Sequence, residues 1–592
     1  MIRVLLSLCA LFSFCANPTL FAQDPQPMAA VSWEIRPDAS GDFVHLEMRL
    51  PISKGAEQIE LRMPYWKPGS YNFSNFEKKL SALTVSNLEG KVFVTESPDP
   101  RTWVISPGGA RELIVRYQIE TSNSARQTQM PAVHLHGPST FLYTDETLLL
   151  PHSLRLSLPD GWSFASGHKQ SAESANLVHS INYDEFVDCP MAFGDLESYE
   201  FYSHGKKFEV AFFGKMPSEK EFSREDWLSR LKMIVDAGYN LMGEFPFERY
   251  VFLYMIGNTR GGWGLEHLNS TTISFNDYFL RQGDLDGFES ITSHEFFHLW
   301  NVKRIRPKQL GPFDYSTDVH TRDLWWLEGV TSYYQDVLLQ RSGLRDNEKN
   351  WFWNTQIENL QTLRLSNGYR VLSPETTSWD IWKSKSNLHV SYYDQGQAIG
   401  LMLDILIRNH TQNERSLDDV VRFLNRWVNY PNPGYEPGDL ERAIFSVTGW
   451  NPSSFFNRHI RGNEAFPFAE VLPLAGVDFF DFAAGSPRLG FTLDDSLLLT
   501  KVDTSLGDLR IGDQVLTVAG IDIAQKSDIR LAMNEVSAGE LISIQVRRDG
   551  IEQDLDVELT VGERRRALLQ AWPMTHPNAL QKQIRESLLA TD

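Results

Sequence analysis

Cysteine is scarce in this sequence, with three residues in 592. Cys9 and Cys15 stand in an N-terminal segment that we expect to be cleaved off, so the mature chain would keep only Cys189. A single cysteine cannot form an internal disulfide, and the folded protein must therefore depend on the size of its hydrophobic core. We expect Cys189 to be a buried, small apolar side chain.

Long apolar runs and an excess of positive charge are also lacking. No stretch beyond the N-terminal segment is long and apolar enough for a membrane-spanning helix. The net charge of −20 argues against nucleic acid or an anionic membrane surface as a partner. The sequence does contain 42% hydrophobic residues, which predicts a folded globular protein, and its length predicts several domains.

The N-terminus is predicted to be a secretory signal peptide, residues 1–22. Arg3 precedes an apolar run over residues 4–16, and small or polar residues follow up to Ala22. This order is typical of a signal sequence, and the run is too short to span a bilayer comfortably. We therefore expect a periplasmic or secreted protein. Lipidation at Cys15 is an alternative, although Phe14 is a poor residue to precede a lipidated cysteine.

The remaining chain divides by its hydrophobic pattern into a multidomain α+β protein. Residues 23–195 alternate apolar and polar side chains between turn residues, which predicts an antiparallel β domain. Residues 196–472 are predicted to be mainly helical, with a capped helix after Ser223 and one strand at Tyr250–Ile256. Residues 473–562 have short strands and one helix, as in a small β module, and residues 563–592 would form a tail with a helix and a loose end.

The run His294-Glu295-Phe296-Phe297-His298 fits the H-E-x-x-H pattern of zinc peptidases. Residues four apart lie on one helix face, so both imidazoles can reach one metal ion. Glu295 would lie beside them, where a carboxylate can take a proton from water. A catalytic zinc needs a third protein ligand, and Glu328 is the best candidate because its apolar surroundings make an unpaired carboxylate costly. The alternative is a Glu328 that is paired with an arginine or lies at a helix edge.

At this point the sequence resembles the glycyl aminopeptidase family of zinc metallopeptidases. The resemblance rests on the run HEFFHLWNVKRIRP and on four shorter segments. These segments are Trp326–Gly329, Gly264–His267, Ser391–Tyr393 and the loop Pro64–Tyr71. The family implies an N-terminal β domain, a thermolysin-like catalytic domain and a C-terminal PDZ domain. From the residues alone, the loop Pro64–Tyr71 is more simply a packed corner.

The resemblance also implies a role for each site residue. His294, His298 and Glu328 would bind Zn²⁺, and Glu295 would be the general base. Tyr393, with Tyr392 as the fallback, would donate a hydrogen bond to the developing oxyanion. Glu266 would hold the free amino group of the substrate, which is what makes such an enzyme an aminopeptidase.

Three positions depart from the family pattern. Trp263 stands where a glycine is usual, which could reshape the amine site, and Gln395 replaces the usual lysine near Tyr393. The segment Phe73–Phe76 lacks an arginine that the family leads us to expect. None of these changes removes a metal ligand or the base, so we expect an active enzyme.

The module near the C-terminus resembles a PDZ domain. Arg488-Leu489-Gly490-Phe491 is similar to the turn that presents backbone N–H groups to a peptide carboxylate, with Gly490 and Phe491 at its centre. The module could instead only pack on the catalytic domain.

The sequence thus predicts a zinc aminopeptidase that removes Gly or Ala from peptides with a free N-terminus, with a possible peptide C-terminus bound at the module. The alternatives are a PDZ peptide-binding protein with an impaired peptidase centre and a zinc endopeptidase.

Overall fold

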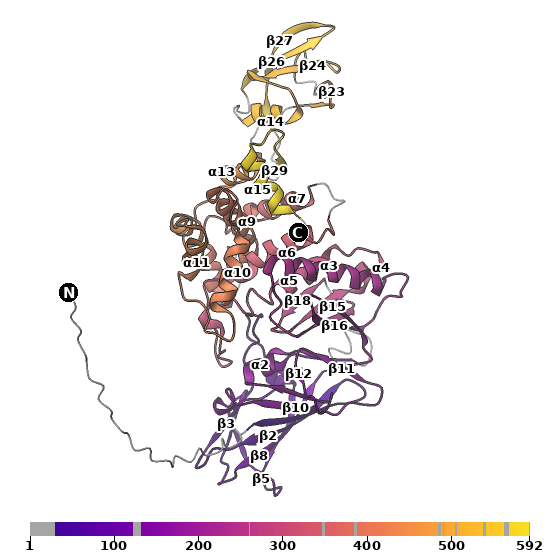
Figure 1. Ribbon diagram of the computed structural model, residues 1–592, viewed down its shortest axis with the longest axis vertical. Helices are drawn as coiled ribbons and strands as arrows, with labels where there is room; N and C mark the ends of the chain where they lie inside the picture. The colour runs from indigo at the N-terminus through magenta and orange to yellow at the C-terminus, as the bar shows by residue number, and fades with distance from the viewer. Residues whose placement is uncertain are drawn as a thin grey trace, which may run out of the picture.

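The computed structural model describes residues 30–121, 132–259, 261–345, 350–383, 388–482, 487–488, 490–503, 506–534, 536, 540–561 and 568–590. The predicted signal peptide, with Cys9 and Cys15, lies outside the described residues, as does Leu489 of the proposed carboxylate turn. Figure 1 shows three parts along the long axis: a β domain at one end, a helical body in the middle, and a small module at the other end.

The N-terminal part is built on an eight-stranded sheet with the order β12-β13-β10-β1-β2-β8-β4-β5. Its central strands β1 (Val31–Pro37), β2 (Phe43–Pro51) and β8 (Glu112–Glu120) contain the predicted alternating segments, and their apolar side chains face the core. The expectation of an antiparallel domain is met except at one place, where β1 pairs with β10 (His152–Leu156) in parallel. The other strands are β3 (Ile59–Arg62), β4 (Leu80–Ser86), β5 (Val92–Phe93), β6 (Thr95–Asp99), β7 (Thr102–Ile105), β9 (Ala132–Leu135), β11 (Ser163–Ser166), β12 (Lys169–Gln170), β13 (Leu177–Ser180) and β14 (Met191–Gly194), with one helix, α2 (Tyr183–Asp188).

The first part of the body is a five-stranded sheet in the order β15-β16-β17-β19-β18. The hydrophobic pattern of the sequence predicted one of these five strands. The predicted Tyr250–Ile256 lies in β17 (Arg249–Gly257). β19 (Ser270–Asn276) escaped prediction because its fully buried residues include Ser270, Thr271 and Thr272, which break the apolar signal of a central strand. The remaining strands are β15 (Glu197–Ser203), β16 (Lys206–Gly214) and the edge strand β18 (Trp263–Glu266).

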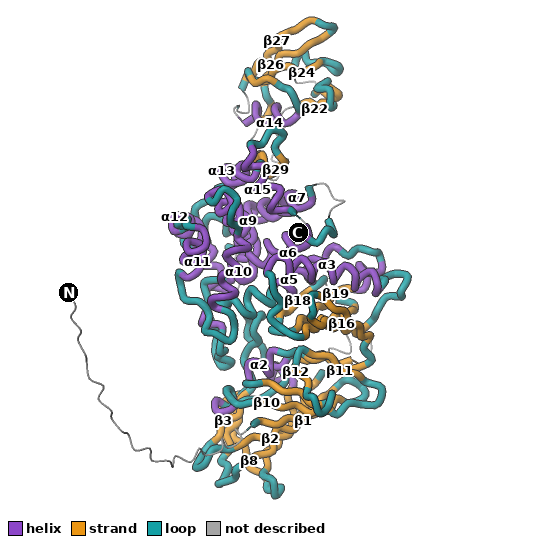
Figure 2. The backbone as a smooth tube through the Cα atoms, viewed as in Figure 1, coloured by secondary structure: helices purple, strands orange, loops and turns teal. Residues whose placement is uncertain are grey.

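Helices form the rest of the body (Figure 2). The helix predicted after Ser223 is α3 (Arg224–Met242): the Ser223 side chain accepts a hydrogen bond from the Asp226 N–H, and Gly243 ends the helix with a left-handed φ of 80°. The helices that follow are α4 (Asp277–Arg281), α5 (Asp286–Phe297), the π-helical turn η5 (Trp325–Val330) with α6 (Thr331–Arg341), α7 (Trp351–Leu365), α8 (Pro374–Trp379), α9 (Tyr392–His410), α10 (Leu417–Val428), α11 (Asp439–Thr448), α12 (Ser453–Phe455) and α13 (Phe468–Val471). Cys189 is buried and free, as predicted. No helix among the described residues has the length and apolarity needed to cross a membrane.

The small module stands beyond the body on a two-stranded stalk of β20 (Val477–Phe482) and β29 (Leu568–Pro573) (Figure 1). It contains a four-stranded sheet in the order β25-β24-β26-β27 and a hydrophobic core of its own. Its elements are β21 (Pro487–Arg488), β22 (Phe491–Leu493), β23 (Leu499–Val502), β24 (Gln514–Val518), β25 (Ile521–Asp522), α14 (Lys526–Asn534), β26 (Leu541–Arg548), β27 (Ile551–Glu558) and β28 (Thr560–Val561). The predicted β-rich texture with one helix is present, and its identity as a PDZ domain stays a prediction.

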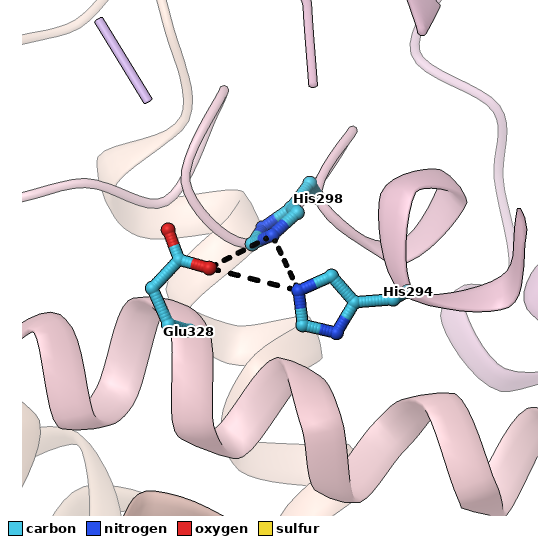
Figure 3. A group of neighbouring side chains, drawn as sticks. All are labelled: His294, His298 and Glu328. Atoms are coloured by element: carbon cyan, nitrogen blue, oxygen red, sulfur yellow. Dashed lines mark hydrogen bonds and ion pairs between the residues drawn. The ribbon is translucent and has the colours of Figure 1, made fainter. Parts of the chain in front are cut away.

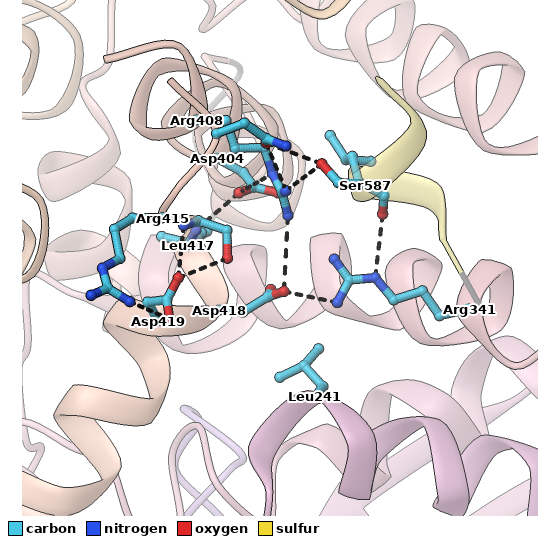
Figure 4. A network of polar contacts seen from close by, with 12 residues as sticks. Leu241, Arg341, Asp404, Arg408, Arg415, Leu417, Asp418, Asp419 and Ser587 are labelled. Carbon is cyan, nitrogen blue, oxygen red and sulfur yellow. Dashed lines mark hydrogen bonds and ion pairs between the residues drawn. The ribbon is translucent and has the colours of Figure 1, made fainter. Parts of the chain in front are cut away.

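The chain returns to the body after the module. The predicted tail helix is α15 (Ala579–Leu589), and its Ile584 and Leu588 side chains are buried against the body. Arg341 donates a hydrogen bond from Nε to the Leu588 carbonyl at 3.2 Å, and Arg408 donates to the Ser587 hydroxyl at 2.8 Å (Figure 4). The helical part of the tail is therefore a packed piece of the body, which its sequence did not suggest.

Candidate active site

Two histidines meet at the end of α5. The H-E-x-x-H run lies on this helix and its last turn, so His294 and His298 project from the same side. Their Nε2 atoms lie 3.0 Å apart, with the ring planes nearly perpendicular (Figure 3). The helical prediction for this run is confirmed.

Glu328 joins them from η5. One of its carboxylate oxygens, Oε2, lies 3.6 Å from His294 Nε2 and 3.3 Å from His298 Nε2 (Figure 3). The π-helical turn widens the backbone here, and the Asn301 side chain donates hydrogen bonds to the Trp326 carbonyl and the Thr331 hydroxyl. Asn301, to which the sequence analysis assigned no role, thereby joins the segment after α5 to the helix that carries Glu328.

The chemistry of these three side chains suits a divalent cation. His298 must carry its proton on Nδ1, because that atom lies 2.7 Å from the Asn301 carbonyl oxygen, which can only accept. The second proton of the ring must therefore sit on Nε2, and its loss leaves a lone pair there that faces His294 and Glu328. Burial alone would lower the pKa of His298, but the Glu328 carboxylate raises it to about 10, so the site attracts positive charge. Two imidazoles and one carboxylate form a ligand set typical of catalytic zinc.

Glu295 lies beside this triad and is buried. Its Oε2 has no hydrogen-bond partner among the residues that the structure describes. Burial raises the pKa of the Glu295 carboxyl well above its ordinary value; the His298 ring opposes this, and the charges of Glu266 and Glu328 add to it. A Cβ atom on Gly264 would lie 2.2 Å from Glu295 Oε1, so only glycine at this position of β18 lets the strand pass so close. The arrangement provides a carboxylate suited to accepting a proton.

Glu266 ends the edge strand β18 and lies beside the same cluster of side chains. One of its carboxylate oxygens lies within 4.8 Å of ligand atoms of Glu295 and His298. Trp263, three residues earlier on β18, is 38% exposed and has its ring 6.2 Å from that of His136. Side chains alternate along a strand, so Trp263 lies on the face opposite Gly264 and its contact with Glu295. The unusual tryptophan therefore does not fill the space beside the base.

The loop Pro64–Tyr71 of the N-terminal domain also reaches Glu266. Trp66 is fully buried and donates from its indole N–H to the Asp314 carbonyl, so the loop is packed, as expected from its residues. Gly69, at φ +83°, lies so close to Glu266 that a Cβ atom would be 2.9 Å from both carboxylate oxygens. The packed loop is thus part of the site as well.

Two further residues of this loop, which the sequence analysis gave no role, face the acidic groups. Burial raises the pKa of Tyr71 well above its ordinary value, and the charges of Glu328 and Glu266 add to this effect. Burial lowers the pKa of Lys67 to about 8, and the Glu266 carboxylate opposes this shift. The family-like spacing of Pro64–Tyr71 was the only sequence signal for these residues.

Tyr393 begins the helix α9, which Ser391 caps. Its ring lies 6.1 Å from that of His294, and its hydroxyl interacts with Glu328. Tyr392 stacks on Tyr393 at 4.8 Å. Gln395 is buried and uses its amide to bind Thr377 and the Leu372 carbonyl, so this residue holds the start of α9 in place of the usual lysine.

The structure does not bring Gly490 and Phe491 near the triad. Both lie in the module beyond the stalk (Figure 1). Gly490 has a left-handed φ of 64° and packs against Leu506, and its carbonyl accepts a hydrogen bond from the Asp503 N–H at 2.7 Å. Phe491 is 7% exposed in the module core.

Comparisons with known proteins agree with this architecture. Residues 287–399 match the M61 glycyl aminopeptidase domain, and residues 34–195 match the peptidase M61 N-terminal domain. A crystal structure of an aminopeptidase N family protein from Idiomarina loihiensis has 22% identity and a TM-score of 0.72, covering 94% of this chain and 100% of that chain. At this identity the match shows a shared fold.

Weaker structural matches are a yeast LTA4 hydrolase in complex with bestatin and an M1 zinc metallopeptidase from Deinococcus radiodurans. The first has 12% identity and a TM-score of 0.48, with 76% of this chain and 71% of that chain covered. The second has 13% identity and a TM-score of 0.46, with 74% and 95% covered. No curated protein sequence gives a significant match. The two domain matches, with the fold and the histidine–glutamate cluster in agreement, support the M61 glycyl aminopeptidase family for this chain and show that it is a metallopeptidase.

Proposed function

We propose that the protein is a zinc aminopeptidase that removes Gly or Ala from the N-terminus of peptides. The observation that carries this proposal is the position of Glu266, with a carboxylate oxygen within 4.8 Å of ligand atoms of Glu295 and His298. A carboxylate set back from the metal ligands can pair with the ammonium group of a free N-terminus. The first peptide bond would then lie beside Glu295.

His294, His298 and Glu328 would hold the zinc ion. Bound there, zinc supplies Lewis-acid chemistry, which polarises a carbonyl and makes water easier to deprotonate. Glu295 takes the proton of the attacking water and passes it to the leaving amine. Tyr393 donates a hydrogen bond from its phenol to the oxygen that becomes negative in the transition state, without adding a charge to the site.

The preference for small first residues rests on the family resemblance and on the crowding around Glu266. The loop Pro64–Tyr71 closes over Glu266, with Gly69 against the carboxylate and Tyr71 near both Glu266 and Glu328. A small side chain would fit beside Glu266 with less displacement of this loop than a large one.

Hydrolysis of peptides that begin Gly-Ala, with free and N-acetylated forms side by side, tests the proposal. The zinc-loaded protein should release glycine from the free peptide only. In Glu266→Ala, kcat/KM for the free peptide should fall about 10- to 150-fold, the equivalent of the roughly 1.5–3 kcal/mol of a hydrogen bond to a charged group. Cleavage of both forms would indicate an endopeptidase, and cleavage of neither with zinc bound would favour a peptide-binding protein with an impaired centre.

A PDZ-like role of the module is a further proposal. Gly490 at φ 64° and Phe491 in β22 are in keeping with a turn that binds a peptide carboxylate. Fluorescently labelled peptides with free C-termini should then bind the full-length protein, and their C-terminally amidated forms should not. Equal binding of both forms would refute the carboxylate turn.

We also propose that the protein is exported, to the periplasm or out of the cell, after removal of residues 1–22. N-terminal sequencing of the mature protein should begin at Gln23. A chain that retains Met1 would contradict this cleavage.

A further inference from the structure

A buried carboxylate lies behind the metal-ligand triad, on the helix that continues from Glu328. Asp336 of α6 is 1% exposed, and three glutamine side chains direct amide N–H groups at it. Gln335 donates to its Oδ1 at 3.0 Å, and Gln356 and Gln397 donate to its Oδ2 at 2.8 Å each. These glutamines come from α6, α7 and α9, so Asp336 ties together the helices that carry Glu328 and Tyr393.

Gln335 also lies against the ring of His294. Its backbone carbonyl accepts a hydrogen bond from the hydroxyl of Ser293, the residue before His294, at 3.0 Å. Burial lowers the pKa of His294, and hydrogen bonding to the Gln335 side chain opposes that shift. The side chain of Gln335 has one end that donates and one that accepts, so its neighbours decide which end faces His294. Asp336 decides this, because an ionised carboxylate only accepts. Since the Gln335 NH₂ group must face Asp336, its carbonyl oxygen must face His294.

The consequence for His294 is a fixed tautomer. A ring nitrogen that faces a carbonyl oxygen has to carry the proton, which leaves the other ring nitrogen with a lone pair. The nitrogen that faces Glu328 and His298 is Nε2. His298 has its tautomer set in the same way by the Asn301 carbonyl. Both histidines can therefore bind one metal ion through Nε2, on the side that faces Glu328.

We propose that Gln335 is a positioning residue for the metal ligand His294 and that Asp336 sets the orientation of Gln335. The inference rests on the proposed zinc site but not on the proposed peptide substrate. Residues behind a metal-bound histidine fix its orientation and tautomer, and their loss commonly weakens metal binding about 10- to 100-fold.

Zinc affinity, measured by competition with a chelator, tests this proposal separately from activity. In Gln335→Met the zinc Kd should rise about 10- to 100-fold. Gln356→Met is the matched control, because Gln356 also donates to Asp336 but is not among the described hydrogen-bond partners of His294. Its zinc Kd should stay within about threefold of the parent. Assays at pH 8 keep Asp336 ionised, since burial raises its pKa to about 7.

A double variant sharpens the test. In the double variant Gln335→Glu with Asp336→Asn, the new carboxylate at position 335 still offers an acceptor oxygen to His294. The new amide at position 336 donates to that carboxylate, which reverses the parental hydrogen bond between the two residues. This variant should restore zinc affinity to within about threefold of the parent, and the visible absorption spectrum of the Co²⁺-loaded protein should match that of the parent. Circular dichroism confirms folding of each variant.

Three results would overturn the inference. Parental zinc affinity in a folded Gln335→Met would show that the link is not needed. An equal loss in Gln356→Met would indicate general packing, and a weak site in the double variant would refute the acceptor argument even if Gln335→Met does not fold. None of these outcomes depends on whether glycine is released from any peptide.

Discussion

The metal-binding side and the amine-binding side of the candidate active site are held in place by different kinds of contact. On the metal side, His298 bonds to the Asn301 carbonyl, His294 to Gln335, and the turn that bears Glu328 to the Asn301 side chain. On the amine side, Glu266 lies at the end of an edge strand. Its carboxylate packs closely against Gly69, which belongs to a loop of the N-terminal domain. The metal side is thus fixed by directional bonds within the body, whereas the amine side depends on how two domains meet.

This difference suggests that the chemistry and the substrate preference can change independently. Substitutions in the loop Pro64–Tyr71 can alter the space around Glu266 without disturbing a hydrogen bond to a metal ligand.

The largest expected effect is on the chemical step. Glu295→Gln should lower kcat by about 10²- to 10⁴-fold, because the variant loses its proton acceptor. Zinc content, measured by atomic emission, should stay at one ion per chain because Glu295 is not among the three proposed ligands. Hydrolysis within tenfold of the parent would refute the role of Glu295.

The next largest effect is expected on the stability of α6 and α9, the helices that pack beside the metal ligands. Arg408 is 4% exposed, and its Nε lies 3.0 Å from a carboxylate oxygen of Asp404 (Figure 4). The other carboxylate oxygen of Asp404 accepts a hydrogen bond from the Tyr333 hydroxyl of α6. Arg408→Met leaves a buried carboxylate without its cation and should lower the free energy of unfolding by about 3–5 kcal/mol. Chemical denaturation measures this change.

Arg415→Met is the matched control for that variant. Arg415 lies in the same network (Figure 4), but its side chain is 55% exposed and 3.8 Å from Asp419. The loss of such a surface pair should cost about 0–1 kcal/mol. Equal losses in the two variants would show that the buried network contributes nothing special to the metal side.

A smaller effect is expected from the loop on the amine side. Gly69→Ala places a Cβ atom 2.5 Å from Leu265 Cδ1 and 2.9 Å from the Glu266 oxygens, so Glu266 must shift. Misplacement of a group that orients the substrate should lower kcat/KM roughly 10- to 100-fold, with zinc affinity unchanged.

Gly55→Ala controls for backbone strain in the previous variant. Gly55 has φ +85°, close to the +83° of Gly69, but a Cβ atom there meets nothing within 4 Å. Gly55→Ala should lower the free energy of unfolding by about 1–2 kcal/mol, as Gly69→Ala does through backbone strain. Its activity should stay at the level of the parent. A comparable fall in kcat/KM would mean that strain, not contact with Glu266, explains the loss.

The smallest effect is expected at Trp263. Its ring lies 6.0 Å from the Lys67 ammonium, and the side chain is on the strand face away from Glu295. Trp263→Gly removes a cation–π contact of about 0.5–1 kcal/mol, so kcat/KM should change about two- to fivefold. A change of a hundredfold would show that this residue acts directly in the active site.

Local patterns accounted for much of the fold and of the metal triad. The histidines and Glu295 share one helix, so their spacing predicts their geometry, and Glu328 was found because an acidic residue interrupts an apolar helix. The contact of Gly69 with Glu266 joins residues almost 200 positions apart in different domains, and no periodicity encodes it. The orientation of Gln335 depends on Asp336, and nothing in the sequence distinguishes this residue from other aspartates in helices. The strand β19 was missed because its buried residues include serine and threonine, which do not give the apolar pattern of a central strand.

The packing of α15 has a consequence for the order of events in biogenesis. A ribosome releases this helix only after the whole catalytic body and the module have been made, yet Ile584 and Leu588 complete the apolar interior of that body. The body therefore cannot reach its final packing before α15 has been made. Until Leu589 has been made, the body would stay incompletely packed, even though the module that precedes this helix in the chain is already present.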